Sequence, residues 1–396
     1  MKKIYIFVGS YIGKENYSFL SEHYYKKQIS VSNSEFERML FESFSINGAD
    51  SYFVGAPSVG RFPLSCKKIF YKKRMSGRIR DCSFCTIVGF SNISKSFHLK
   101  KEVKSLLKEH KNDDIYIAGC EAHKPYLDVI KYVKRKHRGA KSLLVVPDDP
   151  LSMVFSRNFI YKIFKKRNVK QIHYISEKYV DSYLYFTKTI GDKFTFEKPY
   201  LVREGIIERF EDSNSNNKKI VCTYIGKVDE RNGIPFIIEA AKILTNFDFE
   251  VYGSGDYEEK INSINLENLH FHGFVNPSYV DKIMQTSDIF LSPRKNDLSY
   301  TSYSFPSKIL KYISYCKPIV TFKLPCYSSS FDQILIYPED ETVDGFVNAI
   351  KLASENRGAR TRTDTEKYLS YLLKKNMGRD LLSLLDTIKK SFKNNN

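Results

Sequence analysis

Short apolar runs alternate with helical patterns through the first half of the chain. Uninterrupted apolar runs indicate buried strands, and apolar positions three and four residues apart indicate helices. The predicted strands are Ile4–Val8, Ser51–Gly55, Ser83–Val88, Ile115–Ala118 and Leu143–Val146. The predicted helices between them are Ser34–Phe44, His98–Glu109 and Tyr126–Arg138.

The same alternation restarts in the second half of the chain. The predicted strands are Lys219–Tyr224, Asp248–Tyr252, Leu269–His272, Ile289–Ser292 and Pro318–Thr321. The predicted helices are Ile234–Leu244, Tyr257–Ile264, Ser278–Thr286, Pro306–Tyr315 and Glu341–Ser354. Strict alternation of strand and helix implies parallel sheets with helices on both faces. The sequence therefore predicts an α/β protein with two Rossmann-like domains in tandem.

A polar, low-complexity stretch at Glu211–Lys218 separates the two patterned regions. We therefore predict a first domain at 1–205, a linker at 206–218, a second domain at 219–360 and a tail at 361–396. Within the tail, Glu366–Phe392 has a long helical pattern without a strand. We expect it to pack as a terminal helix, and the first domain is one place for it to dock.

The charge of the chain is unevenly distributed. The sequence has 63 Lys and Arg against 45 Asp and Glu, which gives a formal charge of +18. The excess arises between Arg61 and Lys170, in the first domain. A basic excess confined to one domain suggests a nucleic acid, an anionic membrane surface or phosphorylated substrates as partner. The alternative explanation of the charge is that the sequence is generally rich in lysine and that these lysines lie on solvated helix faces.

The start of the chain shows no signal peptide, and no apolar stretch is long enough to cross a bilayer. The seven cysteines are an odd number in a large chain, which fits reduced thiols in a cytoplasmic protein. Cys82 and Cys85 form a single CxxC without a second pair, which is weak evidence for zinc or redox chemistry.

The loops after the strands of the second domain collect glycines and cations. Ligands bind at the carboxyl ends of parallel strands, where loops meet helix N-termini. The loop residues are Gly226, Lys227 and Arg231 after the first strand, Gly253 and Gly255 after the second, Arg294 after the fourth, and Lys308 at a helix start. Together they predict a diphosphate site, with solvated loop cations as the alternative.

These loops resemble the retaining glycosyltransferases of family 4, which have the GT-B fold, and within them a bacterial group that builds capsular polysaccharide and exopolysaccharide. The resemblance is densest at Gly226–Ile234, Val251–Gly255, Phe271–Phe274, Ser292–Arg294, Tyr300–Lys308 and Lys317–Leu324. Weaker matches in the first half are Ser34–Arg38, Gly55–Pro63, Val88–Asn92, Val146–Met153 and Val202–Gly205. The resemblance covers about residues 3–355.

The resemblance implies two Rossmann-like domains facing a cleft. The second domain would hold a nucleotide-sugar donor and the first an acceptor. No cofactor is implied, and a metal is usually not needed, because protein cations take its place at the diphosphate. The implied donor-binding residues are Gly226, Lys227, Arg231, Gly253, Phe274, Val275, Arg294, Tyr303, Ser304, Phe305, Ser307, Lys308 and Lys311.

In the first domain, Asp148 ends a strand where many relatives have a His near the anomeric carbon, and it is our catalytic candidate. A turn or helix-cap aspartate is the alternative. Gly9, Ser10 and Tyr11 match the Gly-rich loop of the acceptor side, or form an ordinary turn. His123 is a further acceptor-side candidate, with a surface histidine as the alternative.

Two positions depart from the family pattern. Lys311 stands where the family has a Glu that accepts hydrogen bonds from the donor ribose, and an ammonium group cannot accept. Cys316 replaces a glycine. A weakly active enzyme, or a non-catalytic GT-B partner subunit, is therefore an alternative function.

We expect a glycosyltransferase of the hexosyltransferase type (EC 2.4), peripheral at the inner face of the plasma membrane. Its acceptor would be a polyprenyl-diphosphate-linked glycan of surface polysaccharide synthesis. The segment Phe155–Arg167 mixes aromatic and basic residues, as an interfacial helix does, with an ordinary amphipathic helix covering the sheet as the alternative. A nucleic-acid-binding protein is a remote alternative, because the sequence has no signature of one.

Overall fold

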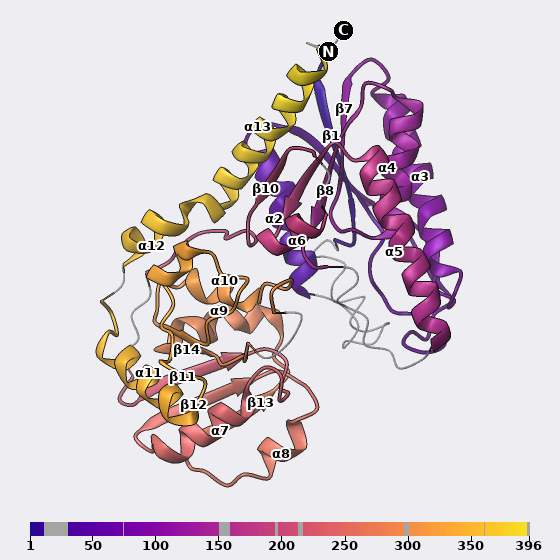
Figure 1. The fold of residues 1–396 in the computed structure, drawn as a ribbon. Coiled ribbons are helices and arrows are strands. Elements are labelled where there is room, and N and C mark those ends of the chain that lie inside the picture. The colour runs from indigo at the N-terminus through magenta and orange to yellow at the C-terminus, as the bar shows by residue number, and fades with distance from the viewer. Residues whose placement is uncertain are drawn as a thin grey trace. The chain divides into compact units, whose positions relative to one another are not determined.

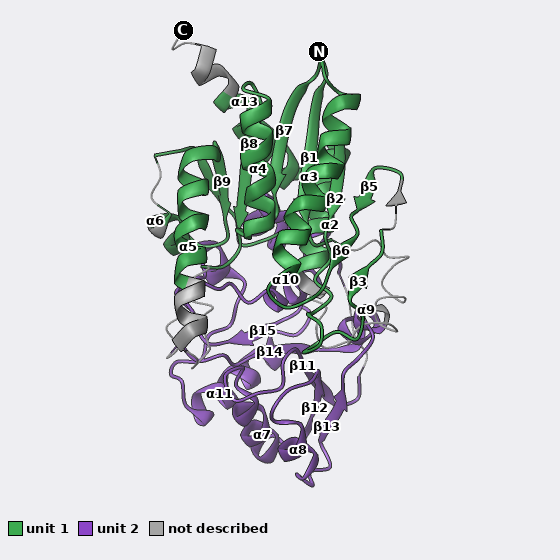
Figure 2. Ribbon diagram, turned by 90° about the vertical axis from the view of Figure 1, so that its right-hand side faces the viewer, with its two compact units in different colours: residues 1–206, 374–396 green, residues 207–373 purple. Residues whose placement is uncertain are grey.

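The computed structural model describes residues 1–11, 31–73, 75–149, 159–194, 197–212, 217–296, 301–359 and 361–393. It divides the chain into two compact units, which Figures 1 and 2 show. Unit 1 consists of Met1–Ile206 and Lys374–Asn396, and unit 2 of Ile207–Leu373.

Unit 1 is built on one sheet with the strand order β10-β9-β8-β7-β1-β2-β5-β4. Its neighbours are parallel, except that β4 and β5 are antiparallel. The strands are β1 (Lys3–Gly9), β2 (Asp50–Gly55), β4 (Met75–Ser76), β5 (Ile79–Asp81), β7 (Asp114–Gly119), β8 (Lys141–Val146), β9 (Ser182–Tyr185) and β10 (Tyr200–Val202). The central strand β1 is buried from Ile4 to Gly9, because helices cover both faces of the sheet.

Helices α2 and α13 cover one face of this sheet, and α3, α4 and α5 lie side by side over the other (Figure 1). The helices of unit 1 are α2 (Val31–Ile46), α3 (Ser91–Glu109), α4 (Lys124–Lys136), α5 (Phe159–Tyr179), α6 (Lys188–Lys193) and α13 (Lys374–Lys393). The face under α2 and α13 is rich in aromatic side chains, and Tyr5, Phe7 and Phe44 pack there as one cluster.

The C-terminal helix belongs to unit 1. Its Met377, Leu381 and Leu385 are buried in the same core as Tyr5 and Phe7. The predicted single helix over Glu366–Phe392 is instead α12 (Arg362–Leu369), a 3-10 turn at Ser370–Leu372, and α13.

Two features of unit 1 differ from the sequence prediction. The run Ser83–Val88 forms only the short strand β6 (Phe84–Cys85), which pairs antiparallel with β3 (Phe70–Tyr71) outside the main sheet. The strand that pairs with β2 on the side away from β1 is β5, whose sequence Ile-Arg-Asp has no apolar run. The strands β9 and β10 were not predicted, because polar and aromatic residues interrupt their patterns. Helix α5 was predicted only in part, as the segment Phe155–Arg167, and it continues to Tyr179.

Unit 2 has a five-stranded sheet with the order β13-β12-β11-β14-β15, in which all neighbours are parallel. The strands are β11 (Ile220–Ile225), β12 (Phe247–Tyr252), β13 (Leu269–Gly273), β14 (Ile289–Ser292) and β15 (Ile319–Thr321). The helices are α7 (Ile234–Ile243), α8 (Glu258–Asn262), α9 (Pro277–Thr286), α10 (Lys308–Ile313), α11 (Val343–Glu355) and α12, with a 3-10 helix at Ser329–Gln333. The two parallel sheets confirm the predicted α/β fold class.

The range predicted as a linker contains ordered structure. Ile207 and Phe210 are buried in a core of unit 2, and the Ile207 amide donates to the Leu372 carbonyl at 2.8 Å. Part of the polar stretch, 213–216, lies outside the described residues. Among the described helices, none is long and apolar enough to cross a membrane.

Candidate functional site

The loops at the carboxyl edge of the unit 2 sheet are joined by backbone hydrogen bonds. The Gly226 amide donates to the Tyr252 carbonyl at 3.0 Å, and the Gly253 amide donates to the Gly273 carbonyl at 2.8 Å. The Val228 amide donates to the Ser254 carbonyl at 3.0 Å. The loops after β11, β12 and β13 therefore form one connected backbone surface.

Glycine is required where these loops touch. Gly253 has φ +137°, and a Cβ on it would lie 1.7 Å from the Gly226 carbonyl oxygen. Gly233 has φ +79°, and its Cβ would lie 1.9 Å from the Pro293 carbonyl oxygen. Side chains at these positions would force the loops apart, so the glycines bring the loops after β11, β12 and β14 into backbone contact.

Lys308 and Arg294 are two cations at this edge of the sheet whose side-chain nitrogens include atoms inaccessible to solvent. The Lys308 Nζ atom is inaccessible to solvent and has no hydrogen-bond partner among the described residues. It lies 4.0 Å from the centre of the Tyr224 ring, and a Cβ on Gly226 would be 3.2 Å from it. Burial and the neighbouring Arg294 guanidinium lower the pKa of Lys308 to about 7, and Asp229 opposes this shift. Two buried like charges repel each other, and a bound anion would relieve the repulsion.

The loop after β11 adds exposed cations to the same edge. Lys227 Nζ is 3.0 Å from Asp229 Oδ2, and its side chain is 63% exposed. Asp229 Oδ1 also accepts from the Asn232 amide at 2.9 Å, which holds the loop in shape. Arg231 is exposed on the same loop. The structure thus brings the predicted Lys227, Arg231, Arg294 and Lys308 to one end of the sheet.

The remaining donor-side candidates surround this edge. Phe274 is exposed and Val275 half-buried, directly after β13. Tyr303 and Ser304 are half-buried and Ser307 is exposed before α10. Phe305 is buried against Tyr327 and Phe331, so only its backbone could face a ligand.

Lys311 forms an ion pair within unit 2. Its Nζ atom is 2.5 Å from Asp281 Oδ1 on α9, and the Tyr315 hydroxyl donates to the same oxygen at 2.7 Å. Lys311 and these hydrogen bonds lower the pKa of Asp281 against the effect of burial. Lys311, which stands where the resemblance led us to expect a carboxylate, is therefore a cation already paired with another carboxylate.

Replacing Lys311 with Glu should destabilise unit 2 modestly and strengthen nucleotide binding. The change breaks an exposed ion pair and places two carboxylates together, which costs about 1 kcal/mol of unfolding free energy. A carboxylate able to accept from ribose hydroxyls should tighten nucleotide binding about tenfold. Melting temperature and nucleotide titration measure the two effects. The double variant Lys311→Glu/Asp281→Asn should regain stability, and equal stability of both variants would contradict the ion-pair assignment.

The carboxyl end of β1 in unit 1 is held by a carboxyl group that the sequence analysis missed. Glu37 on α2 is buried, and it accepts from the Ser10 amide at 2.7 Å and from the Ser10 hydroxyl at 3.0 Å. A Cβ on Gly9 would lie 2.6 Å from its Oε2 atom, so the approach requires glycine. The predicted residues Gly9, Ser10 and Tyr11 therefore form a buried turn fixed by Glu37. Burial, with a contribution from Glu121, raises the pKa of Glu37 to about 8.

Glu37→Gln should flatten the pH dependence of stability. Between about pH 4.5 and 8 the folded protein retains a proton on Glu37 that the unfolded chain has lost, so stability falls as pH rises through this range. Glutamine keeps both contacts to Ser10 without titrating. Between pH 5 and 8, the loss of unfolding free energy should be about 3.5 kcal/mol smaller in the variant than in wild type. Denaturant titrations at both pH values measure this, with Glu35→Gln on the same helix as control. A slope unchanged from wild type would refute it.

Further titratable groups gather at the ends of β7 and β8. Burial and the nearby Asp148 raise the pKa of Glu121. Burial, Lys95 and Arg61 lower the pKa of His123 to about 3, so His123 is neutral near pH 7. Lys95 is buried and donates to the Ala56 and Pro57 carbonyls at 3.2 and 2.9 Å. The predicted Asp148 and His123 are thus part of a charged cluster that includes Glu121 and Lys95.

Glu121 could have been found from the sequence, because it lies just after the predicted strand Ile115–Ala118. Ligand-binding residues of parallel sheets lie at the carboxyl ends of the strands. Glu37 and Lys95 lie within helices, where acidic and basic residues usually face solvent. Only their packing against β1 and the loop after β2 shows that they are buried.

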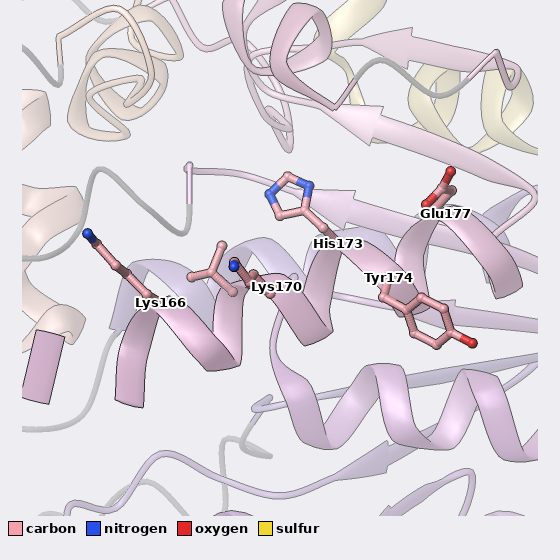
Figure 3. Close-up of a pocket in the computed structure, with 6 residues that line it drawn as sticks. Lys166, Lys170, His173, Tyr174 and Glu177 are labelled. Carbon is pink, nitrogen blue, oxygen red and sulfur yellow. The ribbon is translucent and has the colours of Figure 1, made fainter. Parts of the chain in front are cut away.

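A hollow of about 500 Å³ lies against α5 in unit 1, lined by Lys166, Val169, Lys170, His173, Tyr174 and Glu177 (Figure 3). Its six residues come from one helix, and none of the predicted site residues lines it. The His173 ring stacks on Phe194 at 4.7 Å, which is a structural role. Within the described parts of the chain, no group of three His, Cys, Asp or Glu side chains could hold a metal ion.

Solved structures share this fold across the whole chain. The pneumococcal O-GlcNAc transferase GtfA in complex with UDP and GlcNAc is 12% identical, with a TM-score of 0.58 over 98% of this chain and 99% of that chain. The catalytic domain of starch synthase IV from Arabidopsis thaliana, bound to ADP and acarbose, is 8% identical, with a TM-score of 0.61 over 98% and 100%. A trehalose-phosphate synthase from Burkholderia xenovorans in complex with glucose-6-phosphate is 10% identical, with a TM-score of 0.61 over 98% and 100%. The fold is therefore the predicted GT-B fold.

Residues 206–369 match the family model "Glycosyl transferases group 1". The matched range coincides closely with unit 2, which carries the glycine-joined loops and the cations. Among curated protein sequences, none matches this chain. The family match over residues 206–369 confirms the predicted enzyme class, a glycosyltransferase.

Proposed function

We propose that the protein transfers a sugar, with retention of configuration, from a nucleotide-sugar donor held by unit 2 to an acceptor held by unit 1. The observation that carries the proposal is the Lys308 Nζ atom, which is inaccessible to solvent and lies next to Gly226 in the loop after β11. Burial, and then the Arg294 guanidinium, lower the pKa of Lys308. A diphosphate over this loop would be attracted by both cations and by the exposed Lys227 and Arg231.

The proposed chemistry follows from where charge develops. When the bond between the sugar and the diphosphate breaks, negative charge builds on the departing nucleoside diphosphate. Cations fixed before the reaction stabilise that charge without further reorganisation. Lys308 is held against Tyr224, whose hydroxyl donates to the Lys227 carbonyl at 2.6 Å, so this part of the site is pre-organised.

In unit 1 we assign Asp148 as the catalytic candidate, with Glu121 as its neighbour. An ionised Asp148 would order an acceptor hydroxyl or stabilise positive charge at the anomeric carbon, and its charge contributes to the raised pKa of Glu121. The neutral His123 and the Gly9–Tyr11 turn complete the proposed acceptor side. The proposed acceptor is a polyprenyl-diphosphate-linked glycan in bacterial capsular polysaccharide or exopolysaccharide synthesis. The enzyme would then be cytoplasmic and peripheral at the inner membrane face, and no metal would be required.

A non-catalytic partner subunit is the second candidate function. Lys311 and its ion pair with Asp281 favour it, since the expected ribose acceptor is missing. Thermal shifts against a panel of UDP-, ADP- and GDP-sugars distinguish the two functions. The enzyme should be stabilised by one donor and should hydrolyse it slowly without acceptor. The absence of turnover with every donor, also in Lys311→Glu, would support the subunit. The absence of stabilisation by every donor, also in Lys311→Glu, would refute the enzyme.

A further inference from the structure

Large apolar side chains are exposed in one stretch of unit 1. Of the fifteen exposed large apolar side chains among the described residues, seven lie between residues 64 and 97. We name these seven the apolar patch: Leu64, Ile69, Phe70, Val88, Phe90, Ile93 and Phe97. Phe90, Ile93 and Phe97 are 64%, 67% and 65% exposed, although burial is the rule for residues of this type.

Hydrogen bonds hold the segments of the patch together. The Phe62 amide donates to the Thr86 carbonyl at 3.0 Å, and the Val88 amide donates to the Phe62 carbonyl at 3.1 Å. Strands β3 and β6 pair Phe70 with Cys85, and the Cys85 amide donates to the Ser94 hydroxyl on α3 at 2.9 Å. The patch is therefore built from a loop, a short hairpin and the start of α3. Figure 2 labels the hairpin strands β3 and β6 and helix α3 in unit 1.

Helix α3 continues the patch as a row of cations. Phe90, Ile93 and Phe97 lie three and four residues apart, so they share one face of the helix. The same spacing continues with the exposed Lys101, Lys104 and Lys108. The opposite face packs on the sheet through side chains that include Leu99, Val103 and Leu106. One face of α3 is thus apolar at its N-terminal end and basic towards its C-terminal end.

The charge around the patch is almost entirely positive. Between Arg61 and Lys108 the chain has thirteen Lys and Arg residues and only two acidic residues. Asp81 is buried, and Glu102 is 2.6 Å from Lys73 Nζ. This combination of exposed aromatic and aliphatic groups with lysines suits the boundary between acyl chains and anionic headgroups.

We propose that the apolar patch and the lysines of α3 form the surface by which the protein binds an anionic lipid bilayer. The inference adds a membrane-contacting surface to the proposed function. It depends on the proposed function only where that function supplies a lipid-linked acceptor as the reason for membrane binding. The segment Phe155–Arg167, predicted as the interfacial helix, lies in part outside the described residues, and the proposal does not use it.

The charges favour a bilayer over other partners. A second copy of the chain docked through the same surface would bring the lysines of both copies together, and they would repel each other. A nucleic acid would be attracted to the lysines but would gain little from aliphatic side chains such as Leu64 and Ile93. A bilayer with acidic headgroups satisfies the apolar and the cationic parts at once.

Vesicle sedimentation of the full chain tests the apolar part. Wild type should bind vesicles of phosphatidylglycerol and phosphatidylcholine in equal amounts, and should bind pure phosphatidylcholine weakly. The variant Phe90→Ser/Ile93→Ser/Phe97→Ser should bind the anionic vesicles at least about tenfold less. The matched control is Ile243→Ser/Leu352→Ser, which alters two exposed apolar residues of unit 2 and should leave binding unchanged.

Charge reversal tests the cationic part. Lys101→Glu/Lys104→Glu should weaken binding to anionic vesicles by about tenfold or more, since each lysine contributes about one kcal/mol near such a surface. Lys282→Glu/Lys351→Glu, two exposed lysines of unit 2, is the control. Raising the salt from 0.05 to 0.5 M should weaken wild-type binding and have little effect on the reversed variant.

Three outcomes would overturn the inference: wild type that does not bind anionic vesicles, patch variants that bind like wild type, or a dimer that the patch variants convert to a monomer in light scattering. Thermal stabilisation by nucleotide sugars should be equal in wild type and patch variants. Patch variants that lose vesicle binding but are still stabilised by the donor would support the proposed membrane surface. A wild type that no donor stabilises would count against the proposed function and not against the membrane surface.

Discussion

Lys308→Met should melt at a higher temperature than wild type and bind nucleoside diphosphates at least about 30-fold more weakly. The buried Nζ atom has no hydrogen-bond partner among the described residues, so its removal leaves no described group unsatisfied. Methionine has similar length and lies well against the Tyr224 ring. The unfolding free energy of unit 2 should rise by about 1–3 kcal/mol at pH 7, because a desolvated ammonium group is lost.

Lys308 should also couple proton uptake to ligand binding. Its pKa of about 7 makes it mostly neutral at pH 8, and a bound diphosphate should raise that pKa and recharge the amine. Titration calorimetry with UDP, ADP and GDP at pH 8, in two buffers with different ionisation enthalpies, should show uptake of nearly one proton by wild type and none by Lys308→Met.

The same pKa has a consequence for stability. Between about pH 7 and 10.5 the unfolded chain holds a proton on Lys308 that the folded protein lacks, so this residue makes stability rise with pH in that range. The rise should be absent in Lys308→Met. Lys295→Met, a cation over the Phe236 ring at 4.9 Å, is the control. A Lys308→Met variant with lower melting temperature and unchanged nucleotide affinity would contradict the anion-site assignment.

Gly253→Ala should abolish stable folding of unit 2. The new methyl group would lie 1.7 Å from the Gly226 carbonyl oxygen and 2.8 Å from its carbonyl carbon. Neither loop can retreat without losing the hydrogen bonds from Gly226 to Tyr252 and from Gly253 to Gly273. Overpacking of backbone against backbone with an unfavourable φ of +137° should cost about 4 kcal/mol or more.

Gly358→Ala separates the steric effect from the cost of an unusual φ. Gly358 also belongs to unit 2, has φ +76°, and a Cβ on it would have no neighbour within 4 Å. Alanine there should cost about 1 kcal/mol. Scanning calorimetry should show the transition of unit 2 intact in Gly358→Ala and missing in Gly253→Ala. Similar transitions in the two variants would show that the loops are not in close contact.

The sequence predicted the sheets and the donor edge because both depend on local patterns. A short apolar run such as Ile220–Ile225, followed by a glycine, is typical of a strand buried by helices. Parallel strands bring the loops that follow them to one edge. The glycines and cations after β11, β12 and β14 could therefore be grouped before their contacts were known.

Features that depend on distant packing could not be predicted in this way. Ser83–Val88 has a strand-like composition, but the strand that pairs with β2 on its outer side is the polar Ile79–Asp81. Glu37 is separated from Ser10 by 27 positions, and its role is visible only when α2 lies on the carboxyl end of β1. Lys311 was recognised as unusual, but its partner Asp281 lies on another helix.

Helix α13 has a consequence for how the protein is made. Met377, Leu381, Leu385 and Ile388 complete the core of unit 1, and a Cβ on Gly378 would lie 2.1 Å from the Ser43 carbonyl oxygen. Unit 2 is therefore an insertion between two parts of unit 1. On the ribosome, the part of the apolar sheet face that α13 covers stays exposed until the last helix emerges, whereas the inserted unit 2 can fold earlier. Chains stopped before residue 374 should consequently be captured by chaperones or aggregate, although they contain the whole family-matched segment.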